Sequence, residues 1–335
     1  MTIVYAVILF VLLIFPHELG HFIVAKAVGV KVNEFAFGMG PAIYKKQKGE
    51  TLYAVRLVPI GGYCAMEAEN EASDDDRAFS NKPWWAKISV LLAGAGMNVL
   101  IAILVLSIIM GYTGSATTTI DKVQDASPAK VAGLERGDKI LAVNDREIDS
   151  WQDLTAAIGK TKEPLSITVD RNGEEVTLSA MPQKADDGRY VVGIMPQISH
   201  NVFTAVENGA KATWNMTVMM FHMLKQLITG VVPSSEIAGP IGMVTMVSET
   251  TNYGISYFGY LIALMSLNLA ILNLLPIPAL DGGRILFVFI RMLTGRMISD
   301  DLEGKIHAAG MVLLLGLMVF ATWNDITRLF TRVSK

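Results

Sequence analysis

The pentapeptide His17-Glu18-Leu19-Gly20-His21 has a residue pattern that could hold a metal and hydrolyse a bond. On a helix, residues four apart lie on one face, so the imidazoles of His17 and His21 point to one place with Glu18 beside them. Neutral imidazoles bind zinc, and a neighbouring carboxylate can take a proton from a water molecule that the metal activates. The spacing therefore predicts a zinc site with hydrolytic chemistry.

The alternative is a chance occurrence of the pattern on a surface helix that holds no metal. Apolar residues 3–15 precede the motif and mostly apolar residues 22–30 follow it, as in a membrane span. A charged group near the bilayer centre costs at least roughly 2.5–3.5 kcal/mol, and ionisable residues placed there usually mark functional sites. This cost favours the metal site.

Composition predicts a membrane protein. Of the 335 residues, 52% are hydrophobic and 18% are charged, whereas soluble domains contain about 25% charged residues. Four stretches are long enough, or nearly so, to span a bilayer: residues 3–27, 88–112, 257–275 and 306–323. The first lacks the basic start and small-residue cleavage site of a signal peptide, so we expect it to be retained.

The distribution of charge predicts the orientation of these spans. Basic residues cluster between the first two spans and between the last two, which places both connections in the cytoplasm. The segment 113–210 contains 10 basic and 15 acidic residues and is expected outside, although long domains translocate largely regardless of charge. Three basic residues after the last span argue mildly for the opposite orientation: Arg328, Arg332 and Lys335.

A catalytic zinc typically has three protein ligands, so a third must come from elsewhere in the chain. The segment 273–283 reaches the cytoplasmic end of the third predicted span, at the same depth as the first motif. There Pro276 and Pro278 interrupt the helix, and Gly282-Gly283 permits close backbone approach, which together aim Asp281 at a metal. Alternatively, the prolines end a span and Asp281 caps the next helix.

These two motifs resemble those that define the site-2 protease family of intramembrane zinc metalloproteases, in its bacterial branch that cleaves anti-sigma factors. The resemblance covers nearly the whole chain. It implies that His17, His21 and Asp281 bind one zinc ion and that Glu18 is the catalytic carboxylate. Residues 94–98 are similar to the family's GxxxN element, which implies that Asn98 assists transition-state stabilisation, although small residues in a span more often serve helix packing.

Residues 32–63 alternate apolar positions with glycine and proline, which predicts short strands joined by turns. The resemblance implies a re-entrant, membrane-associated β-hairpin or sheet whose edge holds the substrate by main-chain hydrogen bonds. An ordinary cytoplasmic loop with a hairpin is the alternative.

The segment from Gly133 to Ile140 is similar to a PDZ-domain signature, Gly-Leu-x-x-Gly-Asp-x-Ile. The pattern predicts a helix at 151–158 and strands at 165–171 and 175–180. Such a domain either has a binding groove that senses or sterically filters substrates or is a folded spacer whose groove is unused, and its ligand is unknown. Beyond it, residues 205–232 predict an amphipathic helix on the outer surface. His200, His222 and His307 have no partner at ligand spacing, and Gly239-Pro240-Ile241-Gly242 has a positional role only.

The fold class expected is a mainly α-helical polytopic membrane protein with four transmembrane helices, the membrane-associated β region and an inserted extracytoplasmic α/β PDZ domain. Its predicted parts are an N-terminal membrane core (1–112), the PDZ domain (113–183), an extracytoplasmic linker with the amphipathic helix (184–255) and a C-terminal membrane core (256–335). The expected location is a bacterial cytoplasmic (inner) membrane, with the active site toward the cytoplasmic side.

The resemblance implies that the partners are single-span membrane proteins already trimmed outside by another protease, and remnant signal peptides. Asn268, Asn273 and Pro276 are candidates for substrate binding, with interhelical hydrogen bonding as the alternative for the two asparagines. A catalytically silent PDZ scaffold would lack a ligand or base, and a zinc transporter would line several spans with polar residues. A net charge of −3 and the absence of a basic, aromatic-rich tract argue against nucleic acid, and a single cysteine excludes an intramolecular disulfide.

Overall fold

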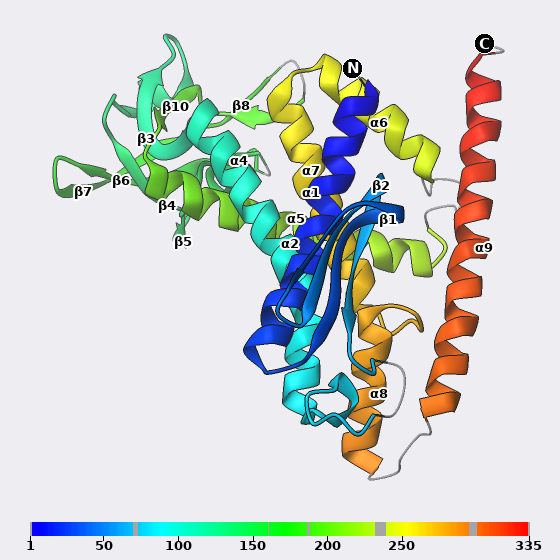
Figure 1. The fold of residues 1–335 in the computed structure, drawn as a ribbon. Helices are drawn as coiled ribbons and strands as arrows, with labels where there is room; N and C mark the ends of the chain where they lie inside the picture. Colours follow the sequence, from blue (N-terminus) through cyan, green and yellow to red (C-terminus); the bar gives the residue numbers. More distant parts are fainter. Residues whose placement is uncertain are drawn as a thin grey trace. The chain divides into compact units, whose positions relative to one another are not determined.

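The protein is described by a computed structural model that covers residues 2–69, 73–159, 161–185, 188–231, 239–294 and 300–333. The chain forms two compact units, one of residues 1–106 with 209–335 and the other of residues 107–208. Figure 1 shows the elements of both. The larger unit is mostly helical with one sheet, and the smaller is a sheet with short helices.

Four helices in the described residues are long and apolar enough to cross a membrane. They are α1 (Thr2–Ala27), α2 (Trp84–Thr113), α7 (Ile255–Leu274) and α9 (Asp300–Val333), the last with its apolar part at Leu302–Thr327. All four spans expected from the sequence are therefore present as helices. Helix α2 begins four residues before the apolar stretch, directly after Pro83, because a proline is well tolerated at the start of a helix.

Helices α1 and α7 pack together with the shorter helix α6 (Pro240–Asn252). The ring of Tyr5 in α1 meets that of Phe258 in α7 edge to face, with centroids 5.0 Å apart. Lipid tails are as apolar as leucine side chains, so helices within a membrane associate through close packing and not through the removal of water. The buried side chains at this contact are Ala6, Leu9, Leu13, Val247, Phe258, Leu261 and Ile262.

The sheet of the larger unit is built from two long strands, β1 (Val32–Lys48) and β2 (Thr51–Met66). Residues 34–37 of β1 each have two partners, one in each half of β2, as in the pairs Phe35–Tyr53 and Phe35–Cys64. The first half of β1 therefore lies between the two halves of β2. Its Phe35 ring lies 4.8 Å from that of Phe22 in α1, centroid to centroid, so the sheet is attached to the helix that carries the HExxH motif. Strands are confirmed within residues 32–63, but they are two long strands joined by one turn and not a series of short ones.

Helix α6 begins at a glycine whose own side chain cannot cap it, and Asp325 of α9 takes that role. The buried Asp325 carboxylate accepts hydrogen bonds from the Gly239 N–H at 3.1 Å and the Gly242 N–H at 2.7 Å. A Cβ at position 239 would lie 2.7 Å from Asp325 Oδ2. The carboxylate accepts hydrogen bonds from N–H groups that have no partner within the helix, and its negative charge interacts favourably with the positive end of the helix dipole. This is the positional role of the Gly239–Gly242 motif.

We expect Asp325→Ala to free the start of α6, because two buried N–H groups lose their acceptor at a cost of about 1–3 kcal/mol. Hydrogen exchange of the α6 amides in the intact protein should be at least about tenfold faster. Thr322→Ala is the control, since that hydroxyl bonds to the Met318 carbonyl of its own helix. Equal exchange of α6 in the Asp325 variant and the wild type would show that the cap is not needed.

The smaller unit contains a sheet with strand order β10-β3-β4-β6-β7, in which β5 (Arg146–Glu147) also pairs with β4. The strands are β3 (Ser115–Val123), β4 (Lys139–Val143), β6 (Leu165–Arg171), β7 (Glu174–Ala180) and β10 (Ile194–Ser199), with a separate short pair of β8 (Gln183–Lys184) and β9 (Tyr190–Val191). Helices α3 (Pro128–Ala132) and α4 (Trp151–Ile158) complete it. The predicted helix at 151–158 and the two late strands are confirmed. The sheet continues to Ser199, beyond residue 183.

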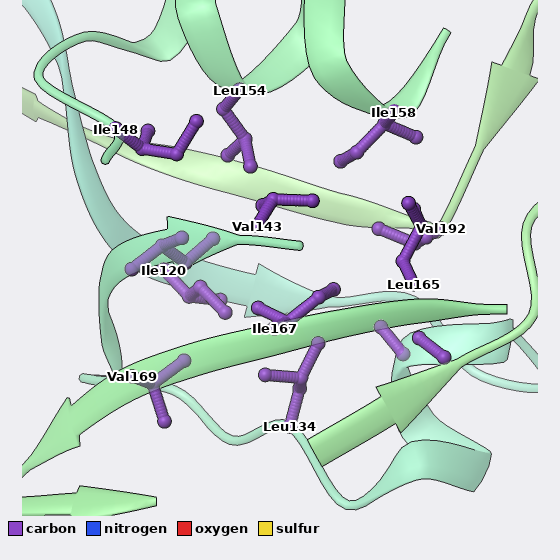
Figure 2. Packing of buried hydrophobic residues seen from close by; sticks show 13 residues of the cluster. Ile120, Leu134, Val143, Ile148, Leu154, Ile158, Leu165, Ile167, Val169 and Val192 are labelled. Carbon is purple, nitrogen blue, oxygen red and sulfur yellow. The ribbon is translucent and has the colours of Figure 1, made fainter. Parts of the chain in front are cut away.

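Figure 2 shows how the core of this unit forms. Alternate residues of β6, namely Leu165, Ile167 and Val169, are fully buried, and Leu154 and Ile158 of α4 point toward the strands. Each such side chain contributes roughly 1.5–3 kcal/mol when removed from water. The smaller unit is stabilised by this core, because a chain with one cysteine cannot form a disulfide within itself.

The residues of the Gly133–Ile140 signature have separate structural roles. Gly133 ends α3 with a φ of 84°, which favours glycine, and Leu134 and Ile140 enter the core. The Asp138 carboxylate accepts hydrogen bonds from the Arg171 guanidinium at 2.7 and 2.8 Å and from the Glu135 N–H at 2.9 Å. The signature therefore joins α3, β4 and β6.

These bonds make the smaller unit sensitive to acid. Burial alone would raise the pKa of Asp138, but the hydrogen bonds from Arg171 and the Glu135 N–H and the Arg171 charge hold that pKa below its ordinary value. A carboxyl with a lowered folded-state pKa stabilises the fold above its unfolded pKa of about 3.9 and loses this contribution as the pH falls below it. Protection factors of the β6 amides should therefore fall below about pH 4.

The variant Arg171→Leu tests the same pair. We expect protection of β6 at pH 7 to fall by about tenfold, because Asp138 stays buried while its partner, about a quarter exposed, is removed. The acid-dependent loss should shrink in this variant, since the pKa of Asp138 returns toward its ordinary value or above. The control is Arg136→Leu, which removes a guanidinium that bonds Asp121 at the surface. An unchanged pH profile in Arg171→Leu would contradict the assignment.

Three further helices are described. The predicted amphipathic helix is α5 (Val202–Ile228), in which Trp214 and Phe221 are exposed. The 3-10 helix η1 (Phe79–Asn81) precedes α2. Helix α8 (Asp281–Thr294) begins after the Pro276–Leu280 loop.

Candidate metal centre

Helix α1 and the first residue of α8 bring three metal-binding side chains together. His17 Nε2 and His21 Nε2 lie 3.2 Å apart, and Asp281 Oδ2 lies 3.4 Å from each of them. Both imidazoles are buried, and the three residues form a candidate metal-binding group. Segments 260 residues apart in the sequence thus converge on one point. This agrees with the prediction that both lie at the same depth in the membrane.

The donor geometry fits zinc. Ligand atoms about 2.0–2.1 Å from a tetrahedral zinc lie about 3.3–3.4 Å from one another, and the three separations are close to this value. Asp281 Oδ2 is buried and has no hydrogen-bond partner among the described residues, which is costly unless a cation binds it. Burial alone would raise the pKa of Asp281, but the His17 and His21 imidazoles beside it lower that pKa to about 2. The Asp281 carboxylate is thus anionic at neutral pH, as a metal ligand must be.

Contacts outside the donor set orient the two imidazoles. His21 Nδ1 lies 2.8 Å from the Val90 carbonyl of α2, so it donates a proton there and leaves Nε2 free to bind a metal. His17 Nδ1 lies 3.4 Å from the amide of the fully buried Asn98. Asn98 thus contacts the far side of the His17 ring, where it can orient that ring.

Helix α2 can pass this close to α1 because of two glycines, one in each helix. A Cβ at Gly94 would lie 2.4 Å from His21 Nε2 and 2.7 Å from His17 Cε1. A Cβ at Gly20 in α1 would lie 2.3 Å from the Ala93 carbonyl oxygen. Both separations are far below van der Waals contact, so the two glycines are required for the helices to meet at the donor set.

Glu18 lies in a cavity of about 350 Å³ beside the three donors. A Cβ at Gly62 in β2 would lie 3.5 Å from Glu18 Cγ, so the second half of β2 passes next to this carboxylate. Polar and apolar groups share the lining: Ile14, His17, Glu18, His21, Tyr63, Cys64, Met66, Glu69, Leu91, Leu269, Asn273, Ala279, Leu280, Asp281 and Arg284. A carboxylate and the candidate metal-binding group therefore line one cavity.

The loop between α7 and α8 presents Asp281. Helix α7 ends at Leu274, and Leu275 is extended, with φ −64° and ψ 143°. A Cβ at Gly282 would lie 2.3 Å from the Leu275 carbonyl oxygen, and one at Gly283 would lie 2.3 Å from that of Ile277. The close backbone approach expected at Gly282-Gly283 is confirmed. Asp281 is also the first residue of α8, where its negative charge interacts favourably with the helix dipole. Asp281 can therefore stabilise the start of α8 and also bind a metal.

Of the three residues predicted to bind substrate, the structure places one in the cavity. Asn273 Nδ2 lies 3.2 Å from His17 Nε2, and Asn273 lines the cavity. Asn268 and Pro276 are not among the residues that line the cavity in the described part of the chain, and Pro276 is exposed. Asn268 lies five residues before Asn273 on α7 and so points to a different face of that helix, whereas Pro276 lies beyond the end of α7.

Sequence reasoning missed three contributors. Gly94 was identified only as part of a motif, Arg284 bonds Glu69 at the cavity wall, and His307 contacts the loop before Asp281. Of these, Gly94 had a sequence signal as part of that motif, and Arg284 had one because it lies about one helical turn after Asp281.

A His-His-Asp donor set with an adjacent glutamate, held by helices apolar enough to cross a membrane, defines a membrane metallohydrolase. The model of peptidase family M50 matches residues 5–317, and this chain belongs to that family. It is a zinc metalloprotease. It is 34% identical over 329 residues to a protein named "Putative zinc metalloprotease" from Clostridium acetobutylicum, covering 97% of each chain. A protein of the same name from Fusobacterium nucleatum is 34% identical over 346 residues, covering 98% of this chain and 100% of the other.

Part of the chain is also similar to solved structures. A PDZ domain of the SdrC-like protein from Listeria monocytogenes is 18% identical over 24% of this chain and 87% of that chain, with a TM-score of 0.23.

Proposed function

We propose that this protein cleaves peptide bonds within or near the transmembrane segments of single-span membrane proteins. His17, His21 and Asp281 are the zinc ligands in this proposal, and Glu18 is the catalytic base. The carrying observation is the set of three donor atoms 3.2–3.4 Å apart, next to Glu18, on and beside helices that can cross a membrane. A catalytic metal buried among such helices acts on substrates that reach it in the bilayer.

Zinc supplies a Lewis acid that lowers the pKa of water and polarises a carbonyl. Glu18 accepts the proton of the attacking water and then delivers it to the nitrogen of the leaving amine, so that one carboxylate serves as base and acid. Asn273 donates from its amide toward the same space, where it can bind the substrate carbonyl. Asn98 and the Val90 carbonyl hold the imidazoles in place.

The substrate is proposed to bind as an extended strand along the second half of β2. Residues 62–66 pair with β1 on one side, and Tyr63, Cys64 and Met66 line the cavity that contains Glu18. A strand added to such an edge gains main-chain hydrogen bonds and exposes its peptide bonds to the base. A helical substrate must unwind first, since backbone groups bonded within a helix cannot pair with a strand.

The substrate class proposed is that of anti-sigma factors and other single-span proteins already trimmed outside, together with remnant signal peptides. The smaller unit is proposed to be a PDZ domain outside the cytoplasm that filters these substrates. The metal centre then faces the cytoplasmic side of a bacterial inner membrane. This arrangement follows from the basic connections between the spans.

The test is co-expression with a tagged single-span reporter whose external domain is truncated. The intact chain should release a cytoplasmic fragment, and mass spectrometry should place its end in or near the transmembrane segment. Asp281→Asn should release none, and a zinc chelator should abolish cleavage by purified protein. If no reporter of this class is cut while a soluble peptide is cut, intramembrane specificity is wrong. If zinc is absent from the purified protein, the metal assignment is wrong.

A further inference from the structure

His307 of α9 contacts the loop that presents Asp281. Its Nδ1 accepts a hydrogen bond of 2.8 Å from the Ala279 N–H. Ala279 lies two residues before Asp281. The side chain of His307 is 11% exposed, so water does not readily replace this bond.

The residue held by His307 has an unfavourable backbone conformation. Ala279 has a φ of +78°, in the left-handed region that residues other than glycine rarely adopt. Such a conformation persists only when its surroundings hold it. The bond from the Ala279 N–H to His307 is the contact outside the loop that does so.

Helix α9 touches the same loop one turn further on. A Cβ at Gly310 would lie 2.4 Å from the Pro278 carbonyl oxygen and 2.6 Å from Pro278 Cβ. Positions 307 and 310 lie on one face of the helix. Helix α9 therefore contacts two neighbouring loop residues directly before the proposed zinc ligand.

His307 is itself held in place. Its ring lies 5.5 Å from the Phe287 ring of α8, centroid to centroid, and its Nε2 faces Glu303 Oε1 at 3.7 Å. Glu303 in turn pairs with Arg291 of α8 at 2.5 Å. Because Nδ1 accepts a bond, the neutral ring carries its proton on Nε2, on the side of Glu303. The ring orientation is thus determined by α8 and α9 together.

We propose that His307 is a positioning residue for the metal centre. By accepting the Ala279 N–H, it holds the Leu275–Leu280 loop in the conformation that presents Asp281 to zinc, and Gly310 gives that loop the space it occupies. Helix α9 thereby sets zinc affinity without supplying a ligand. The proposal rests on the assignment of Asp281 as a zinc ligand.

The test compares variants of the full-length protein purified in detergent. Zinc affinity is measured by competition with a chromophoric chelator, and the cobalt-substituted protein gives a visible spectrum that reports ligand geometry. We expect His307→Leu, which removes the acceptor, to weaken zinc binding by about 10–100-fold, as for other residues that orient metal ligands. The cobalt spectrum should change with it. In His307→Asn the amide oxygen takes the place of Nδ1, and affinity should stay within about threefold of wild type.

Two glycines of α9 provide a matched pair. Gly310→Ala leaves His307 in place but displaces Pro278, and zinc binding should fall as in His307→Leu. In Gly316→Ala, the new Cβ meets no atom within 4 Å, and affinity should not change. The Gly310 variant keeps the test valid if His307→Leu does not fold. Wild-type zinc affinity and cobalt spectrum in both His307→Leu and Gly310→Ala would overturn the proposal, as would equal damage by Asn and Leu at position 307.

Asp281→Asn separates this inference from the proposed function. If that variant binds zinc as tightly as wild type, the ligand assignment itself is wrong. If it loses zinc while His307→Leu and Gly310→Ala retain it, the ligand assignment stands and the role of His307 is refuted.

Discussion

Glu18→Gln is expected to abolish peptide cleavage while zinc remains bound at the wild-type stoichiometry. The amide has the size of the carboxylate but cannot accept a proton from water, and a positioned acid-base group contributes about 10²–10⁴-fold to rate. Glu18 is not part of the His17, His21 and Asp281 donor group, so zinc binding does not need it. The measurements are cleavage of the tagged reporter and metal analysis of the same purified sample.

The control for this variant is Asp281→Asn, which should lose both zinc and cleavage. The two variants together separate the base from the ligands. Cleavage by Glu18→Gln at more than about one tenth of the wild-type rate would show that another group accepts the proton. Loss of zinc from Glu18→Gln would show instead that Glu18 supports the metal.

Gly94→Ala is expected to remove zinc binding and activity together. The added Cβ would lie 2.4 Å from the Nε2 atom of His21 that faces the metal, and 2.7 Å from His17 Cε1. The imidazole of His21 cannot retreat without giving up its bond to the Val90 carbonyl, and α2 cannot retreat without separating from Gly20 of α1. We expect zinc affinity to fall by at least about 100-fold, beyond the effect of losing one orienting contact.

Gly96→Ala is the matched control, because the same methyl group is added to the same helix two residues away and meets no atom within 4 Å. Its zinc affinity and activity should equal those of wild type. Size-exclusion chromatography checks that both variants remain folded. If Gly94→Ala binds zinc normally, α1 and α2 do not meet at the donor set as the structure has them.

The parts of this site that sequence reasoning could predict are those with local signals. Hydropathy over some twenty residues identifies a span, and a helical period of 3.6 places His17 and His21 on one face. Asp281 was predicted because prolines, glycines and a carboxylate coincide at the end of a span. Strands within residues 32–63 were predicted from turn residues between apolar positions.

The remaining parts depend on contacts between segments distant in the sequence. The role of His307 could not be predicted because its hydrogen bond goes to a backbone N–H 28 residues away. The side chain of Asn98 points to a His17 ring nitrogen, and only packing of α1 against α2 determines that. Strand β10 was not expected as part of the sheet, since its partner β3 lies about 75 residues earlier. The periodicity of a sequence shows which side of a helix or strand a residue occupies, but not which residues of other elements it contacts.

The distance along the chain between the two halves of the donor set has a consequence for biosynthesis. His21 leaves the ribosome 260 residues before Asp281, and at about 5–20 residues per second this interval lasts about 13–52 seconds. During this time the nascent chain carries two of the three proposed ligands and its base. A peptidase assembled in this order acquires its third ligand only after its first two spans, its inserted domain and its third span have been synthesised. Its first three spans are therefore synthesised before the chain has all three proposed ligands, and only the fourth, Leu302–Thr327, follows them.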